Sequence, residues 1–214
     1  MSTTPSSSNL GLTLMDEVAS DHITDLTADA AEALLDSMTD AAEVLEAFPV
    51  FGGAVKLIRA GFSIHDRLFL RKLSKFLLEL HTVSVDERFE FVREFDGDPG
   101  FKKRVGEQLV LLLDRFDDLE KATVLGKLFR AFMVGRADYH LFGRLSGIVD
   151  RAYLPDLSRL KHFERDTPGD DAIRALEALG LVYQSVLDGG NAAGVSVHRY
   201  SISSLGQQLA RLLF

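Results

Sequence analysis

The clearest pattern in the sequence is the stretch from residue 53 to residue 81, GAVKLIRAGFSIHDRLFLRKLSKFLLELH. Apolar side chains recur in it close to a heptad register, and Lys and Arg fall between them. This spacing places the apolar side chains on one face of a helix and the basic side chains on the other. The stretch therefore predicts a long amphipathic helix whose apolar face carries Val55, Phe62, Phe69, Leu73, Phe76 and Leu80.

Three interpretations of this helix are open. It can be a core helix with a solvated basic face, or an interaction helix that docks an acidic segment or releases it to a partner. It can also bind a membrane surface, because anionic headgroups attract an apolar helix face that is flanked by Lys and Arg. In the second and third interpretations, the residues expected to contact a partner or membrane are Phe62, Arg67, Phe69, Arg71, Lys72 and Lys75.

Charge is distributed unevenly along the chain. The first 55 residues contain ten carboxylates and no Lys or Arg, and all 24 Lys and Arg lie from Lys56 onward. A block of one sign beside a basic helix suggests that the two segments neutralise each other. We expect a disordered acidic tail over residues 1–26 and then a helix over residues 27–47 that serves as a masking arm. Its contact residues would be Asp36, Asp40, Glu43 and Glu46.

Further helices are predicted up to residue 163. Ser84 and Glu87 form a capping-box pattern, which begins a helix with Phe89, Val92 and Phe95 on its apolar face. The acidic corner at residues 114–120 is expected to be a solvated helix junction. Helical spacing predicts the other elements at about residues 100–115, 119–132, 138–148 and 155–163. The fold class is mainly α, a multi-helix bundle over residues 27–165 followed by a module with a small β hairpin over residues 166–214.

The pattern changes in that C-terminal module. A helix is expected over residues 170–179. A β hairpin is then expected over residues 181–202, because stretches rich in β-branched and aromatic residues flank the turn sequence Asp188-Gly189-Gly190-Asn191. Ser203 or Ser204 should cap a final helix.

Two phrases in the module, ALEALGLV (residues 175–182) and YSISSLGQQL (residues 200–209), resemble the end of a winged-helix domain. In that family a helix ends in a Leu-Gly-Leu step, a β wing follows, and a Tyr-x-Leu-Thr-x-Leu-Gly phrase opens the last helix. Here Ile202 and Ser203 stand in place of the usual Leu and Thr. The resemblance covers about 50 residues and implies a winged-helix-like fold for the module.

DNA binding is not the favoured function of this module. Winged-helix and related DNA-binding proteins direct Arg, Lys, Asn or Gln from a recognition helix toward base edges. The helix over residues 170–179 offers only Arg174 for this purpose, and seven basic residues balance seven acids from Arg151 to the end. A charge-balanced surface gains little from the phosphate backbone. We therefore expect a protein-contact or packing module, and in the alternative DNA-binding regulator the DNA contacts would be made by Arg174 and Arg199.

The remainder of the chain resembles poorly characterised helical proteins of bacteria, some of them linked to phage defence and abortive infection. The resemblance lies in a short apolar stretch with Pro and Gly that runs into a basic helix, Phe48 to Leu80, and in phrases such as LGKLFRAF over residues 125–132. It implies a role in bacterial stress or phage defence and assigns no function to single residues.

The sequence contains no recognisable catalytic or cofactor-binding pattern. There is no Cys, so thiolate chemistry and disulfides are excluded, and none of the six His has metal-site spacing. Phosphate-binding loops and nucleophile elbows are missing. We expect a non-enzymatic protein with no cofactor and no metal. The lack of a signal sequence and of a long charge-free apolar run predicts a cytoplasmic protein, with peripheral membrane location as the alternative.

These observations lead to one main functional prediction. The chain is expected to be a non-enzymatic interaction or regulatory protein that acts through its basic amphipathic helix, which the acidic N-terminal arm masks. The expected partner is another protein or a second copy of the chain. The alternatives are a winged-helix DNA-binding regulator and a membrane-surface effector, and nucleic acid is the least favoured partner.

Overall fold

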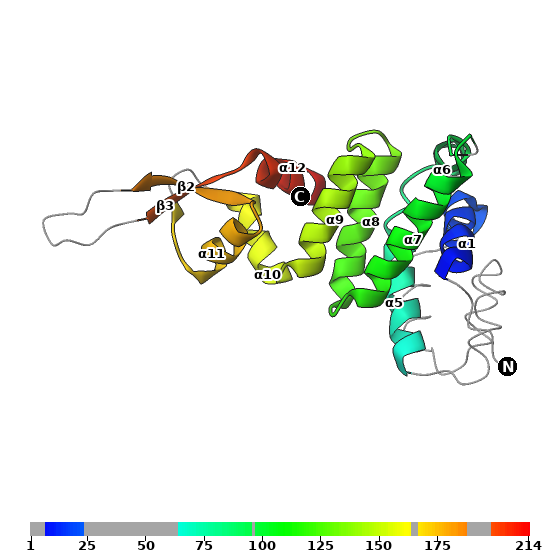
Figure 1. Ribbon diagram of the computed structural model, residues 1–214, viewed down its shortest axis with the longest axis horizontal. Helices are drawn as coiled ribbons and strands as arrows, with labels where there is room; N and C mark the ends of the chain where they lie inside the picture. Colours follow the sequence, from blue (N-terminus) through cyan, green and yellow to red (C-terminus); the bar gives the residue numbers. More distant parts are fainter. Residues whose placement is uncertain (1–6, 24–63, 96, 164–166, 188–197) are drawn as a thin grey trace, which may run out of the picture. The chain divides into compact units, whose positions relative to one another are not determined.

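The computed structural model describes residues 7–23, 64–95, 97–163, 167–187 and 198–214. This part of the chain is mainly helical, with a small antiparallel sheet near the C-terminus (Figure 1). The predicted fold class, mainly α with a small C-terminal β hairpin, is confirmed. The chain divides into two compact units, Met1–Tyr139 and His140–Phe214. This division differs from the predicted boundary between residues 165 and 166.

The helices predicted in the first unit are present where the structure describes the chain. The long helix of the 53–81 stretch is described from Ile64 to Leu78, and its earlier residues lie outside the described ranges, as do the 27–47 helix and the masking arm. The described elements of this unit are α1 (Ser7–Ala19), the 3-10 turn η1 (Asp21–Ile23), α5 (Ile64–Leu78), α6 (Val85–Arg93), α7 (Pro99–Arg115) and α8 (Leu119–Met133).

Side-chain caps fix where these helices begin. The Ser84 hydroxyl accepts a hydrogen bond from the Glu87 amide, and the Glu87 carboxylate accepts one from the Ser84 amide, which completes the predicted capping box before α6. Asp98 caps α7 by accepting from the Phe101 amide at 2.9 Å. Asp118 caps α8 in the same way. At its other end α8 is followed by Gly135, whose φ of 70° belongs to the left-handed region that glycine adopts without strain.

The prediction of a disordered tail over residues 1–26 is wrong for residues 7–23, which form α1 and η1. Leu14, Met15 and Val18 are buried where α1 packs on α7 and α6. The helices approach so closely that a β-carbon at Gly106 would overlap the carbonyl oxygen of Gly11. Ser and Thr in this segment give a weak helical pattern, and packing against α7 supplies what local propensity does not.

The buried side chain of Arg88 joins three parts of the first unit. Its guanidinium donates to the carbonyl oxygens of Val18 at 3.1 Å and Ser20 at 2.8 Å, next to the end of α1. It also donates to the carbonyl oxygens of Leu80 and Val83, in the turn between α5 and α6. A guanidinium has five N–H donors and stays charged in proteins, so its burial is costly unless acceptors such as these carbonyl oxygens surround it.

Aromatic rings form the core around α6, α7 and α8. The ring of Phe91 meets those of Phe95, Phe129 and Phe132 edge to face, at centroid distances of 4.8, 5.6 and 5.0 Å. Edge-to-face pairs stabilise a core beyond the area that they bury. α5 packs along α8 and adds Phe76, whose centroid lies 5.5 Å from that of Phe129.

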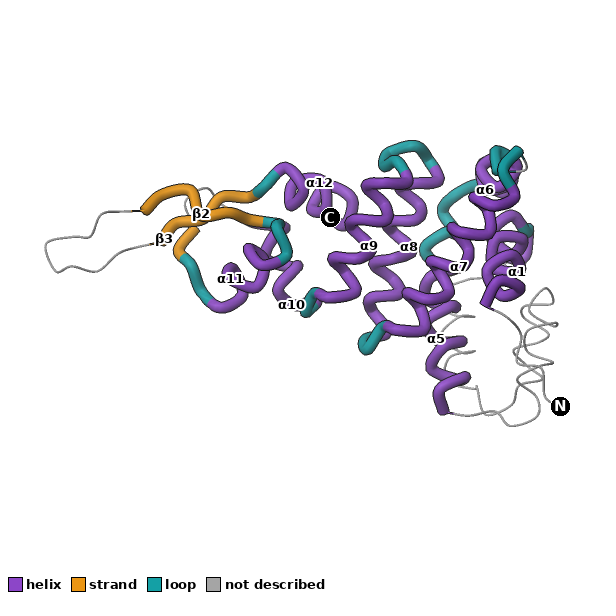
Figure 2. The backbone as a smooth tube through the Cα atoms, viewed as in Figure 1, coloured by secondary structure: helices purple, strands orange, loops and turns teal. Residues whose placement is uncertain are grey.

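The second unit contains the predicted hairpin and one strand that the sequence analysis did not predict. The three strands are antiparallel in the order β1-β3-β2. Strands β2 and β3 run side by side (Figure 2). Tyr183 lies opposite Ser201, with a bulge between Gln184 and Val186. The predicted turn at residues 188–191 lies outside the described residues. The elements are α9 (Tyr139–Arg151), which begins at the last residue of the first unit, α10 (Leu154–Leu157), the 3-10 helix η3 (Ser158–His162), β1 (Thr167–Pro168), α11 (Asp171–Ala178), β2 (Val182–Leu187), β3 (His198–Ile202) and α12 (Ser204–Leu213).

Local signals in this unit act as expected. Gly180 follows α11 with a φ of 73°, and Ser203 caps α12 by accepting from the Gly206 amide at 3.0 Å. The carbonyl oxygen of Leu181 lies where a β-carbon of Gly206 would stand, so glycine permits α12 to approach the start of the hairpin. α10 and η3 pack on α11 and α12, and for this reason they belong with the C-terminal unit and not with the helical bundle.

Gly106→Ala should destabilise the protein because the new methyl group meets the backbone of α1, which cannot rotate away. Overpacking of this kind costs about 1–3 kcal/mol. Chemical denaturation measures the loss. Gly147→Ala is the matched control, since a β-carbon there meets no atom within 4 Å and alanine favours the helix by roughly 0.5–1 kcal/mol. Equal stability of Gly106→Ala and the wild-type chain would contradict the observed packing of α1.

Candidate interaction surfaces

Lys72 lies in the interior and not on a basic outer face of α5. Its side chain is only 7% exposed, and its ammonium donates to the carbonyl oxygens of Asp114 at 2.9 Å and Phe116 at 2.8 Å. These carbonyls end α7, where unpaired backbone oxygens and the helix dipole favour a cation. Burial lowers the pKa of Lys72, and the nearby carboxylates of Asp114 and Asp117 oppose that effect. Lys72 therefore has a structural role. It could contact a partner only if its two hydrogen bonds to the end of α7 were broken.

Basic side chains of α5 and α8 contact the acidic corner at residues 114–120. Lys75 pairs with Glu120 at 2.7 Å, and His65 lies 3.2 Å from Asp114. Lys121 pairs with Asp117 at 2.7 Å, and this hydrogen bond lowers the pKa of Asp117. Water screens the exposed carboxylates of these pairs and weakens them, so the buried hydrogen bonds of Lys72 hold α5 to the corner more strongly. The predicted neutralisation of the basic helix by the acidic N-terminal arm stays a prediction, because the arm lies outside the described residues.

The apolar face of α5 belongs to the core. Leu70, Leu73, Phe76 and Leu77 are buried, with α5 packed along α8. Of the other predicted contact residues, Phe69 and Arg71 are half-buried, and Phe62 lies outside the described residues. Arg67 lies in α5, but its side chain is not among those described. The described part of α5 thus agrees with the core-helix interpretation.

Several cations of α6, α7 and α8 are also paired with carboxylates of their own unit. Lys102 contacts Asp16 of α1 at 2.9 Å, and Lys103 lies 4.0 Å from Glu107. Three further pairs involve Arg104 with Asp98 at 3.6 Å, Arg130 with Glu79 at 3.8 Å and Arg93 with Glu90 at 2.6 Å. Lys102 thus helps to hold α1 on α7.

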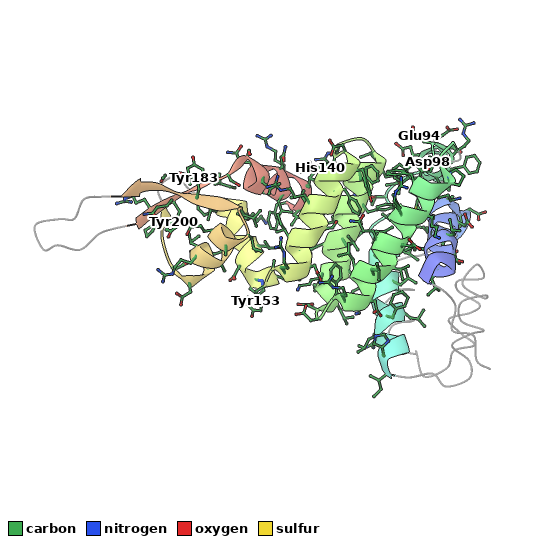
Figure 3. All side chains as sticks on the ribbon, in the orientation of Figure 1. Glu94, Asp98, His140, Tyr153, Tyr183 and Tyr200 are labelled. Carbon is green, nitrogen blue, oxygen red and sulfur yellow. The ribbon has the colours of Figure 1, made fainter. Side chains whose placement is uncertain are left out.

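The outer face of α6 was not recognised in the sequence. Phe89, predicted to pack in the core, is 55% exposed, and Phe91 is buried in its place. The buried face consists of positions 88, 91, 92 and 95, which follow helical spacing. The charge of Arg88 concealed this face, because an arginine is rarely fully buried. Glu94 and Asp98 lie at the end of this unit where α6 passes into α7 (Figure 3).

In the described part of the C-terminal unit, two arginines form ion pairs with neighbouring carboxylates. Arg174 pairs with Asp171 at 2.9 Å, and that pairing raises the pKa of Arg174. Arg159 pairs with Asp170, also at 2.9 Å. Arg199 is exposed on β3. Tyr183 is 52% exposed on β2, whereas Tyr200 on the neighbouring strand is buried (Figure 3). Of the two predicted DNA-contact residues, Arg174 is thus engaged by a neighbouring carboxylate.

Comparisons with known proteins give no further assignment. No protein-family model matches the chain, and searches of the curated proteins and of the solved structures found no match. Within the described ranges, no three His, Asp or Glu side chains are grouped in a way that could hold a metal ion. None of the described helices has the length and apolar character needed to span a membrane.

Lys72→Met should lower the free energy of unfolding by about 1–3 kcal/mol at neutral pH, because two buried carbonyl oxygens lose their donor. The loss should grow as the pH rises toward 10.5, the ordinary pKa of lysine. In that range the unfolded chain holds the proton more firmly than the folded chain, so wild-type stability gains from Lys72 as pH increases. Denaturant titrations across the alkaline range measure this difference. Lys103→Met, at an exposed position, controls for the lost charge, and a constant difference between wild type and Lys72→Met would contradict the prediction.

Proposed function

We propose that the chain is a non-enzymatic interaction or regulatory protein whose partner is another protein. One observation carries this proposal. Nine of the described Lys and Arg side chains lie within 4.0 Å of a carboxylate of their own unit, where they are less available to DNA or lipid headgroups. Representative pairs are Lys102 with Asp16, Lys121 with Asp117 and Arg174 with Asp171, at 2.9, 2.7 and 2.9 Å.

Such pairing weakens the case for a polyanionic partner. Affinity for nucleic acid comes largely from Lys and Arg that neutralise phosphates and release counterions. A cation already neutralised by a neighbouring carboxylate must exchange one anion for another and gains little. Contacts between proteins do not need such a surplus of positive charge, because interface cores are depleted of charged residues and enriched in aromatic ones.

The contact is best sought on fixed surfaces and not on a released α5. Exposing the apolar face of α5 would remove Phe76 and Leu77 from the core and break both hydrogen bonds of Lys72. Exposed aromatic side chains on stable elements are better candidates, and Phe89 on α6 and Tyr183 on β2 are two of them. A contact on these fixed surfaces does not require release of the masking arm from α5. The expected setting in bacterial stress or phage defence rests on sequence resemblance alone.

A winged-helix DNA-binding regulator is the second candidate. The observation that favours it is the order of elements in the second unit, in which α11 is followed by a hairpin and by the Ser203-capped α12, as the resemblance implied. The exposed position of Arg199 on β3 also fits this candidate. The engagement of Arg174 by Asp171 counts against it.

Binding measurements with the full-length chain separate these candidates. Labelled duplex DNA and vesicles of phosphatidylserine and phosphatidylcholine are each titrated at low salt, and light scattering gives the mass of the protein in solution. We expect DNA affinity weaker than the roughly 10⁻⁴–10⁻⁶ M of ordinary non-specific binding, and no vesicle binding. Tight DNA binding that falls steeply with salt and is lost in Arg174→Ala or Arg199→Ala would establish the regulator instead. Vesicle binding would establish the membrane effector.

A further inference from the structure

The outer face of α6 combines an exposed aromatic ring with a surplus of carboxylates. Phe89 is 55% exposed, and Asp86, Glu87, Glu90 and Glu94 are exposed around it. Between Ser84 and Asp98 the sequence has six acids and two arginines. One of these arginines, Arg88, points inward and is fully buried. We call the side chains of Asp86, Phe89, Glu90, Arg93 and Glu94 the α6 face.

Positive charge on the α6 face is scarce. Arg93 is the only exposed cation of α6, and it pairs with Glu90 at 2.6 Å. Glu87 is occupied in the capping box with Ser84. Among the described residues, neither Asp86 nor Glu94 has an ion-pair partner. Carboxylates on the same helix repel one another, and a partner that brings Lys or Arg to them relieves that repulsion.

The α6 face is held rigidly from behind. On the buried side of the helix, Phe91 packs edge to face against Phe95 and Phe132. Arg88 fixes the same side by donating to the carbonyl oxygens of Val18 and Ser20. A helix anchored in this way loses little conformational entropy when a partner binds, so an exposed ring on it is a preorganised anchor.

We propose that the α6 face docks a basic amphipathic helix of a partner protein. An apolar side chain of that helix covers Phe89, and its Lys or Arg side chains meet Asp86 and Glu94. The proposal rests on the proposed function in taking the partner to be a protein. A second copy of the α6 face is not the occupant, because two such faces would bring carboxylates together. Charge complementarity therefore selects a Lys- or Arg-rich partner.

The test uses the full-length chain and two labelled synthetic peptides of about 18 residues, long enough to form a helix on binding. One peptide carries Leu and Lys at amphipathic helical spacing, and the other carries Leu and Glu at the same positions. Fluorescence anisotropy at low salt should show binding of the Lys peptide and none of the Glu peptide. Phe89→Ala should lower the affinity for the Lys peptide about tenfold, as expected for loss of a central aromatic anchor.

Matched variants locate the binding site. Leu111→Ala removes an apolar side chain of α7 that is also 55% exposed, and it should leave the affinity unchanged. Glu94→Lys should weaken binding and reduce its salt dependence. Circular dichroism and denaturation confirm that each variant is folded, which is expected because these side chains are exposed.

Three results would overturn the docking proposal. The Lys peptide does not bind, Phe89→Ala binds it as tightly as the wild-type chain does, or Leu111→Ala lowers the affinity for it as much as Phe89→Ala does. Those outcomes leave the proposed function intact as long as DNA and vesicles also fail to bind. Tight binding of DNA or vesicles would instead overturn the proposed function, whatever the peptides do.

Discussion

The first unit is organised around the burial of one positive charge. The guanidinium of Arg88 is removed from water, and it remains in the core because carbonyl oxygens next to the end of α1 and in the turn after α5 accept its N–H groups. The last carbonyls of a helix have no partner within the helix. A single side chain from α6 thus satisfies backbone oxygens around the ends of two other helices. The positions of α1 and α6 both depend on this cluster of hydrogen bonds.

Lys72 repeats the same principle at the other end of the bundle. Its ammonium reaches the carbonyl oxygens that end α7, and it joins α5 to the corner between α7 and α8. Both cations hold a helix terminus, and neither faces a partner. The basic residues of a helix with this pattern are usually assigned to its solvated face. Here one of them, Lys72, is buried. It is therefore missing from the basic surface that DNA or a membrane would need.

The pairing of charges within each unit has a direct consequence for function. A chain with 24 Lys and Arg has enough positive charge for a nucleic-acid surface, but affinity depends on cations that are free to neutralise phosphates. Carboxylates of the same unit engage many of those described. What distinguishes the remaining surface is the exposed ring of Phe89 among acidic side chains on α6, and its rigidity comes from the same core that Arg88 and Phe91 build.

The helical class of the fold, the cap at Ser84, a cap at Ser203 or Ser204 and the C-terminal hairpin could be predicted from the amino-acid sequence. These features depend on spacing, hydrogen bonding and turn chemistry within a few residues. The helix over residues 7–19 could not be predicted in this way, since α1 forms by packing on α7 across Gly11 and Gly106. Contacts between distant segments likewise turn Arg88 and Lys72 inward and leave Phe89 outward. Helical spacing identifies a face of mixed charge and apolar character, but carbonyl oxygens from distant segments determine whether a cation on that face can be buried.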